Sequence, residues 1–216
     1  MDYQIVGTVS AAATLKDLLN SPEKLQVCDL VELRFDEHMN SEECLDLCKQ
    51  LREHTKVLLT IRTNREGGTW DIEDEKRFKL FQFFANDVDM IDLELKSELF
   101  KNHSRSEFPE KLTVISSFHD YEKTPSGDEI QKLIDSGKSW GADIVKLAVT
   151  SSTEQDIDLL ESFLKQGGLC LIAMGDLGSV TRSKFPLKGS LLTYGYLDES
   201  AAPGQFSAEE LNKLLR

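Results

Sequence analysis

The chain has 216 residues, of which 40% are hydrophobic and 29% are charged, and its formal net charge at pH 7 is −13. This length and composition predict one globular domain over residues 1–216 and exclude an intrinsically disordered chain. An acidic surface repels a phosphate backbone and the longest apolar run has only six residues (169–174), so neither a nucleic acid nor a membrane is an expected partner.

Short β-branched runs alternate along the chain with longer polar segments of helical period. In chain order, the runs predict eight strands at residues 4–9, 30–35, 57–61, 90–95, 112–117, 144–149, 169–174 and 191–196. The polar segments predict helices at residues 14–20, 41–53, 74–86, 128–140, 153–166 and 207–215. Ser41, Ser126 and Ser207 are each followed by acidic residues, a pattern typical of helix N-termini.

This alternation of strands and helices predicts a parallel sheet with right-handed crossovers. Eight such units predict an α/β fold of the closed (β/α)8 kind, a TIM barrel formed by a single domain. A doubly wound open sheet is the alternative. That architecture commonly has a glycine-rich turn after its first strand, whereas the first strand here runs into Ser10-Ala11-Ala12-Ala13.

The cysteines are too few for a disulfide scaffold in a chain of this size. They are Cys28, Cys44, Cys48 and Cys170. Cys44 and Cys48 share a helix face with Leu47 and Leu51, which favours buried thiols over half of a metal site. Residues 1–10 lack the basic and apolar regions of a secretion signal. We therefore expect a cytoplasmic protein without a metal site.

Several predicted strands carry charged residues at alternate positions, although strands covered on both faces should be apolar throughout. Because side chains alternate between the two faces of a strand, each polar set points one way, into the barrel. These inward-facing residues are Glu32, Arg34, Asp36, Thr60, Arg62, Asp92, Glu94, Ser117, His119 and Lys146. Buried charges are costly unless they are paired, and barrels carry their active sites at the C-terminal ends of the strands. The convergence favours an active site over a structural ion network.

Lys146 lies in the middle of an apolar strand and has no acidic neighbour in the sequence. Desolvation disfavours the ammonium form of such a lysine, and a neutral amine can attack a ketone to form an imine. His119 is the candidate acid–base group, and Glu94 on the preceding strand is available to orient its ring. The remaining histidines occupy loop or helix-end positions that predict solvent exposure: His38, His54 and His103.

Seven motifs occur in order from about residue 31 to residue 205. They are residues 31–36, 60–68, 89–94, 116–119, 142–146, 174–182 and 202–205. Together they resemble the type I 3-dehydroquinate dehydratases, a family of lysine Schiff-base lyases. The resemblance implies that the chain dehydrates the small molecule 3-dehydroquinate to 3-dehydroshikimate in the shikimate pathway of aromatic amino acid biosynthesis. It also implies that no metal or organic cofactor is required.

The resemblance further implies a role for each matching residue. Lys146 would form the Schiff base, His119 would carry the proton and Glu94 would orient His119. Arg182 would bind the substrate carboxylate with its planar fork. The other substrate-binding positions implied by the family motifs are Glu32, Arg34, Arg62, Gln205 and Ala201.

Two positions depart from the family pattern. The closing loop often has a serine where this sequence has Ala201, next to Ser200, so one substrate hydrogen bond is expected to be lost or supplied differently. Tyr194 replaces a frequent phenylalanine, which keeps an aromatic wall and adds a hydroxyl group. The loop is expected to close over the substrate, with Gly204 as its flexible point.

Two other functions are compatible with parts of this pattern. A class I aldolase or transaldolase would also use a strand lysine, with residues 175–178 as a phosphate loop, but the other motifs favour the dehydratase. A non-catalytic barrel has no need to keep both Lys146 and His119. Members of the family commonly dimerise, so a homodimer is one expected assembly. The family also occurs fused to a shikimate dehydrogenase.

Overall fold

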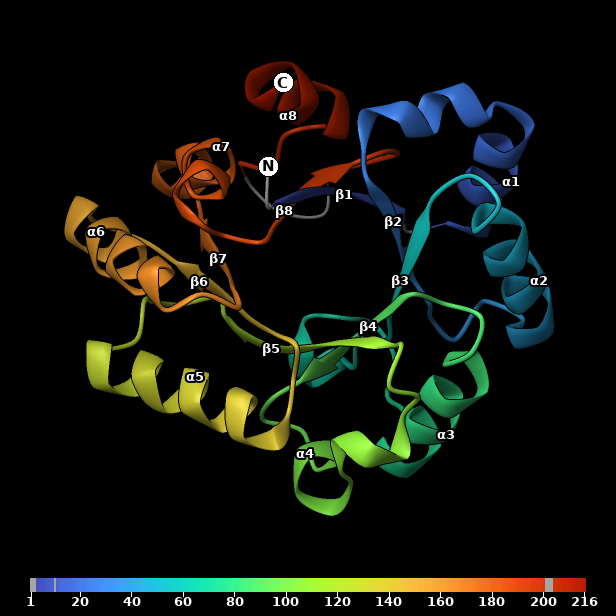
Figure 1. The fold of residues 1–216 in the computed structure, drawn as a ribbon, viewed down its shortest axis with the longest axis horizontal. Coiled ribbons are helices and arrows are strands. Elements are labelled where there is room, and N and C mark those ends of the chain that lie inside the picture. Colours follow the sequence, from blue (N-terminus) through green and yellow to red (C-terminus); the bar gives the residue numbers. More distant parts are fainter. Residues whose placement is uncertain (1–2, 10, 201–203) are drawn as a thin grey trace.

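A computed structural model describes residues 3–9, 11–200 and 204–216, with only the backbone described at Ala12. Its eight parallel strands form one sheet in the order β7-β6-β5-β4-β3-β2-β1-β8. Their bounds are β1 (Gln4–Val9), β2 (Leu30–Arg34), β3 (Lys56–Thr60), β4 (Met90–Glu94), β5 (Thr113–Asp120), β6 (Ile144–Thr150), β7 (Leu169–Met174) and β8 (Leu192–Tyr196). Figure 1 shows them as an inner ring with the helices outside.

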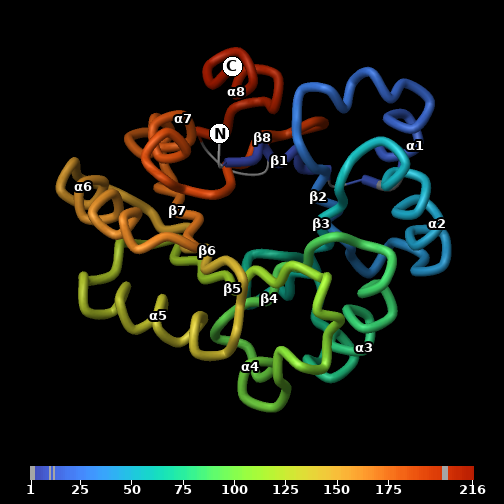
Figure 2. The backbone as a smooth tube through the Cα atoms, viewed as in Figure 1, coloured from blue at the N-terminus to red at the C-terminus, as the bar shows by residue number. Residues whose placement is uncertain are grey.

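β7 and β8, the first and last strands of this order, lie next to each other. The sheet therefore curls into a nearly closed barrel. The backbone N–H of Leu191, just before β8, donates to the carbonyl of Leu169 at the start of β7, at 2.8 Å. The chain winds around the barrel in sequence order (Figure 2). The predicted (β/α)8 architecture is therefore confirmed, and the doubly wound alternative is wrong.

A helix follows each of the eight strands in the chain. Their bounds are α1 (Ala12–Asn20), α2 (Ser41–Leu51), α3 (Asp74–Phe84), α4 (Leu99–Asn102), α5 (Gly127–Trp140), α6 (Glu154–Phe163), α7 (Thr181–Lys184) and α8 (Ala208–Leu215). The side chains of Ser126 and Ser207 cap α5 and α8, as predicted. The predicted start of α2 at Ser41 is confirmed, but its N-cap is Asn40, whose side chain accepts a hydrogen bond from the Glu43 N–H at 3.0 Å.

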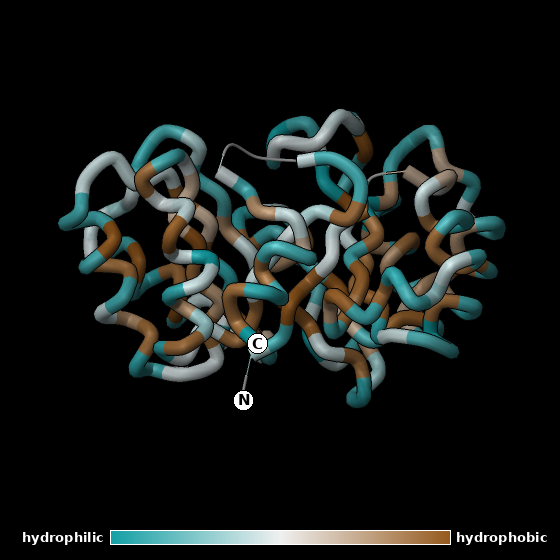
Figure 3. The backbone as a smooth tube through the Cα atoms, turned by 90° about the horizontal axis from the view of Figure 1, so that it is seen from above, coloured by the Kyte–Doolittle hydropathy of each residue, from teal (hydrophilic) through white to brown (hydrophobic). Residues whose placement is uncertain are grey.

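The hydrophobic core has two layers separated by the strands. Outside the barrel, residues such as Val31, Leu33 and Val145 pack beneath the helices. Inside it, a smaller apolar cluster includes the first residues of β2, β4, β6 and β8 and fills the N-terminal end: Leu30, Met90, Ile144 and Leu192. The hydrophobic stretches run through the middle of the molecule, and the outer turns are mostly hydrophilic (Figure 3). The N-terminal end of the barrel is thus closed by side chains, and the polar residues gather towards the other end.

The predictions for cysteines and histidines mostly agree with the structure. All four cysteines are free and buried, and Cys44 and Cys48 pack in the core with Leu47 and Leu51, as predicted. His38 and His54 are exposed, but the predicted exposure of His103 is wrong. Its ring stacks on Phe78 with centroids 3.5 Å apart. None of the described helices is both long and apolar enough to cross a membrane.

Candidate active site

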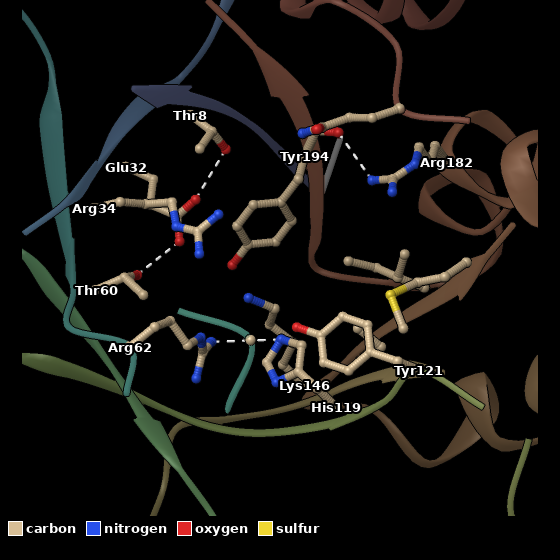
Figure 4. Close-up of a pocket in the computed structure, with 15 residues that line it drawn as sticks. Thr8, Glu32, Arg34, Thr60, Arg62, His119, Tyr121, Lys146, Arg182 and Tyr194 are labelled. Atoms are coloured by element: carbon tan, nitrogen blue, oxygen red, sulfur yellow. Dashed lines mark hydrogen bonds between the residues drawn. The ribbon is translucent and has the colours of Figure 1, made fainter. Parts of the chain in front are cut away.

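A cavity of about 150 Å³ opens at the C-terminal ends of the strands. Its lining includes seven of the residues identified from the sequence: Glu32, Arg34, Arg62, His119, Lys146, Arg182 and Gln205. Glu94 lines a neighbouring cavity that shares His119 with the first. Ala201 lies outside the described residues. Figure 4 shows that the labelled side chains converge on one space from strands around the barrel.

Successive side chains of a strand point to opposite faces, and this alternation places the polar side chains inside the barrel. On β2, Leu30, Glu32 and Arg34 face the interior, while Val31 and Leu33 pack against the outer helices. The other charged strands follow the same rule, so their polar residues meet above the apolar floor of the barrel. The inward orientation inferred from the sequence pattern is confirmed for these strand residues. It is wrong for Asp36, which lies beyond the end of β2 and accepts a hydrogen bond from the His38 N–H at 2.9 Å.

Lys146 is paired with an acid, which its sequence neighbours did not indicate. Its Nζ atom lies 2.9 Å from Oδ2 of Asp92, and the lysine is only 5% exposed. The other oxygen of Asp92 accepts hydrogen bonds from Arg62 at 2.8 Å and from the Ser117 hydroxyl at 2.5 Å. Burial by itself would raise the pKa of Asp92, but Arg62 and Lys146 hold this pKa well below its usual range. Asp92 is therefore a fixed negative charge beside the amine.

His119 is held between Glu94 and Arg62. Its Nδ1 atom lies 2.8 Å from Oε2 of Glu94, and its Nε2 atom lies 3.5 Å from Nη2 of Arg62. Because a guanidinium can only donate, Nε2 is the unprotonated nitrogen and Nδ1–H donates to Glu94. Burial, together with the positive charges of Arg62 and Lys146, lowers the pKa of His119 well below its ordinary value of 6.5. The neutral imidazole therefore presents an unprotonated nitrogen at the pocket, as a general base requires.

The pKa of Glu94 is also shifted from its ordinary value. Burial raises its pKa to about 7, although the nearby Arg62 acts in the opposite direction. Arg62 donates to Oε2 of Glu94 at 3.1 Å, the same oxygen that faces His119. The protonation of Glu94 thus changes near neutral pH, where it controls the hydrogen-bond acceptor available to His119.

The loop after β3 keeps Arg62 in this position. Gly67 has a φ of 80°, and a side chain at Gly68 would lie 2.5 Å from the carbonyl oxygen of Arg62, so both positions require glycine. Glu66 accepts a hydrogen bond from the Thr63 N–H at 3.2 Å. Glu66 is also bonded to Arg77 of α3, which is fully buried. The paired glycines and Glu66 are thus structural parts of the motif that carries Arg62.

Glu32 has both carboxylate oxygens occupied. Thr8 donates to one oxygen at 2.9 Å and Thr60 donates to the other at 2.6 Å. These threonines come from β1 and β3, the strands on either side of β2. Glu32 therefore faces the pocket in one fixed orientation.

Arg182 differs from the other charged residues because no acid pairs with it among the described residues. It is 5% exposed, and Nη1 donates to the carbonyl of Tyr194 at 3.2 Å. Burial lowers the pKa of Arg182 to about 10. A desolvated guanidinium that lines a pocket without a counter-charge is suited to bind an anionic ligand group.

The sequence pattern identified most of this lining but missed some polar neighbours. Thr8, Tyr121 and the contact between Asp92 and Lys146 were not singled out as site features. The position of Asp92, two residues before Glu94 on the same strand face, was the available signal for it. Together, the described residues provide an amine nucleophile, a neutral histidine base and an anion-binding arginine. This combination suits imine chemistry on a small carboxylated ketone.

Comparisons with known proteins agree with this chemistry. The sequence pattern of the family described as type I 3-dehydroquinase matches residues 8–216. The 3-dehydroquinate dehydratase of Methanococcoides burtonii is 36% identical over 211 residues, which cover 90% of each chain. Two solved structures are also similar over the full barrel. The enzyme from Geobacillus kaustophilus has a TM-score of 0.85 and 25% identity, over 100% of this chain and 90% of its own. The type I enzyme from Clostridium difficile has a TM-score of 0.84 and 28% identity, over 99% and 91%.

Proposed function

The chain belongs to the type I 3-dehydroquinase family, and we propose that it dehydrates 3-dehydroquinate to 3-dehydroshikimate through a Schiff base on Lys146. The resemblance seen in the sequence is thereby confirmed, and the reaction places the chain among the lyases of the shikimate pathway. The roles of the residues are inferred from one observation. The adjacent strands β4, β5 and β6 bring together two contacting pairs in one site, Lys146 with Asp92 and His119 with Glu94.

The first step is the attack of Lys146 on the substrate ketone. Nζ of the protonated lysine loses two protons in all as the carbon–nitrogen bond forms, both protons end on the ketone oxygen, and this oxygen departs as water to leave an iminium. Asp92, 2.9 Å from Nζ, offsets the positive charge of the iminium at the atom where it develops. We infer this role for Asp92 from its position and its ionisation.

The second step is the elimination itself. The iminium withdraws electrons from the neighbouring carbon, and His119 removes a proton there through Nε2. His119 then delivers this proton to the departing hydroxyl, so that water leaves and the histidine returns to its neutral form. Glu94 fixes the ring and stabilises the imidazolium that forms between the two transfers. Hydrolysis of the conjugated iminium releases 3-dehydroshikimate and regenerates Lys146.

The remaining side chains would hold the substrate ring. Arg182 binds the carboxylate, because it is the buried cation of the pocket that lacks an acid among the described residues. Glu32, Arg34, Arg62 and Gln205 bind the ring hydroxyls and the ketone end. Orientation matters because well-placed reacting groups account for several orders of magnitude in rate. The part assigned to Ala201 of the closing loop stays a prediction.

Borohydride trapping tests this function directly. The protein is incubated with 3-dehydroquinate and sodium borohydride, then analysed by intact mass and peptide mapping. A stable adduct on Lys146 is expected, together with an enone product detected by ultraviolet absorbance in the unreduced reaction. The Lys146→Ala variant should give neither, whereas Lys138→Ala, which removes an exposed lysine of α5, should give both. A folded protein that yields no adduct and no enone would contradict the proposal.

Membership of the dehydroquinase family sets aside the sugar-phosphate aldolase and the non-catalytic barrel. We further propose that residues 1–216 act as one catalytic domain in a reducing cytoplasm, which agrees with the single sheet and the four buried thiols. A homodimer is the assembly expected from the family resemblance. Sedimentation equilibrium measures that state.

A further inference from the structure

The hydroxyl group of Tyr194 is buried at the pocket without a hydrogen-bond partner among the described residues. Tyr194 lies on β8, is 4% exposed and lines the same cavity as Lys146 and His119. Figure 4 shows its phenol pointing into the space between Lys146 and the residues of β2 and β3. A buried hydroxyl that gives up its hydrogen bonds to water destabilises the fold unless something compensates for them. Such a group at a ligand site indicates a partner supplied by the ligand.

The ring of Tyr194 is held firmly against the reacting amine. The Nζ atom of Lys146 lies 4.2 Å from the ring centroid, in a cation–π contact. The Tyr194 backbone pairs with Val6 of β1, and its carbonyl accepts a hydrogen bond from Arg182 at 3.2 Å. The tyrosine therefore has a fixed place in the cavity, with its ring face against Nζ of Lys146.

The nearby carboxylates do not compete for this hydroxyl. Both oxygens of Glu32 are bonded by threonines, and both oxygens of Asp92 are bonded by cations or by Ser117. Tyr194 therefore offers the site an uncommitted neutral donor. An oxygen on the carbon attacked by Nζ is only two bonds from that nitrogen, and Lys146 and Tyr194 line the same cavity.

We propose that the Tyr194 hydroxyl donates a hydrogen bond to the oxygen on the carbon that Lys146 attacks, first the ketone oxygen and then the carbinolamine hydroxyl. This inference rests on the proposed Schiff-base function. The tyrosine keeps its own proton and transfers none. Its burial raises the pKa of the phenol well above its ordinary value, in keeping with a group that stays a donor. Its contribution is to polarise the ketone for attack and to stabilise the tetrahedral intermediate.

The test compares the Tyr194→Phe variant with the wild type in a rapid-quench borohydride experiment. The readout is the rate at which the reduced adduct on Lys146 appears after mixing with 3-dehydroquinate. Loss of one neutral hydrogen bond should slow imine formation about tenfold, which corresponds to about 1.4 kcal/mol. The melting temperature of the unliganded variant should stay equal or rise, because the phenylalanine removes an unpaired buried polar atom.

Tyr3→Phe is the matched control. The Tyr3 hydroxyl donates to the carbonyl of Leu215 at 2.8 Å, beside the N-terminal end of the barrel. Its loss should lower the melting temperature and leave the trapping rate unchanged. An unchanged trapping rate in Tyr194→Phe overturns the inference, as does a raised KM with normal imine formation, since the hydroxyl would then contact another part of the substrate. Failure of the wild type to form any adduct would instead overturn the proposed function.

Discussion

Lys146 and Asp92 form an ion pair in the barrel interior, with 2.9 Å between Nζ and Oδ2. The two residues lie on β6 and β4, which are separated in the sheet by β5. Asp92 is fully buried, and its second oxygen is bonded to Arg62. One carboxylate therefore offsets two cations, the amine that reacts and the guanidinium that faces His119. This arrangement couples the nucleophile to the acid–base group through Asp92.

The Asp92→Asn substitution removes this charge and keeps the shape of the side chain. We expect kcat to fall about 10- to 100-fold, since the iminium loses a charged hydrogen-bond partner. Two buried cations are also left without their shared counter-charge, so the free energy of unfolding should drop by about 3–5 kcal/mol. Steady-state kinetics and urea denaturation measure the two effects.

Ser117→Ala is the control for that substitution. It removes one hydrogen bond to Asp92 but leaves the carboxylate charge in place. Its effect on stability should be about 1 kcal/mol, and its kcat should remain well above that of Asp92→Asn. Equal kcat values in the two variants would show that the charge of Asp92 is not what supports the reaction.

The pair of Glu94 and His119 predicts an unusual pH dependence. The pKa of Glu94 is raised to about 7 by burial, so the carboxylate that accepts from Nδ1–H exists above this value and is lost below it. The pKa of His119 is lowered, so the histidine is still neutral where Glu94 becomes protonated. We therefore expect kcat/KM to decline as the pH falls through about 7. Because Glu94 and His119 interact, the pKa seen in this pH profile is an apparent value of the pair and not of either residue alone.

Glu94→Gln tests the origin of this inflection. The amide cannot ionise, so the variant should have a kcat/KM that is about 10- to 100-fold lower and flat through neutral pH. A further decline should occur only in more acidic solution, where His119 itself becomes protonated. If the variant retains the inflection near neutrality, a group other than Glu94 is responsible for it.

The strand faces could be predicted from the sequence because they follow from local geometry. Alternation along β2 and β4 alone indicates that Glu32 and Glu94 point the same way as their polar neighbours. The end of β5 could be predicted only in part, since alternation places His119 on the same face as Ser117 but does not say where the strand stops. The predicted strand stops at residue 117, but the observed one continues to Asp120, because His119 and Asp120 pair with Ala148 and Val149 of β6. That pairing is a tertiary effect.

The partners of the charged residues also depend on tertiary structure. Alternation says that Asp92 and Lys146 both face inward, but the stagger of the barrel decides that they touch. The apolar neighbours of Lys146 suggested an amine without a counter-charge, and the structure corrects this interpretation. Arg77 resembles an exposed helical residue in the sequence, yet it is fully buried against the Arg62 loop.

Arg182 should contribute to substrate binding at the expense of stability. We expect Arg182→Gln to raise KM about 100-fold, because the substrate carboxylate loses a charge-assisted hydrogen bond. The unliganded variant should be at least as stable as the wild type, since the buried guanidinium has no acid partner among the described residues. KM and melting temperature together distinguish this role from a structural one, in which the substitution would lower the melting temperature.

A substrate analogue provides the control for Arg182. The primary amide of 3-dehydroquinate lacks the negative charge, so the wild type should bind it much more weakly than the acid. Arg182→Gln should bind the acid and the amide almost equally, because the group that discriminates between them is gone. Undiminished discrimination by the variant would place the carboxylate elsewhere in the pocket.

Arg77 connects helix α3 to the loop that carries Arg62, so a substitution at Arg77 should affect the active site. It is fully buried on α3 and is bonded to Glu66, to Asp74 and to the carbonyl of Ile61, just before Arg62. Arg77→Met leaves the two acids without their buried partner, so we expect the free energy of unfolding to fall by about 3–5 kcal/mol. The loop that carries Arg62 should also loosen, which raises KM while borohydride still traps substrate on Lys146.

Arg52→Met is the matched substitution at a surface ion pair. Arg52 lies 2.9 Å from Asp89, but its side chain is 34% exposed, so the loss should be below about 1 kcal/mol with unchanged kinetics. Arg77→Lys, which keeps one charge but not the fork, should fall between the wild type and Arg77→Met. If Arg77→Met is as stable and as active as Arg52→Met, the bonds from Arg77 to Glu66 and Asp74 do not support the Arg62 loop.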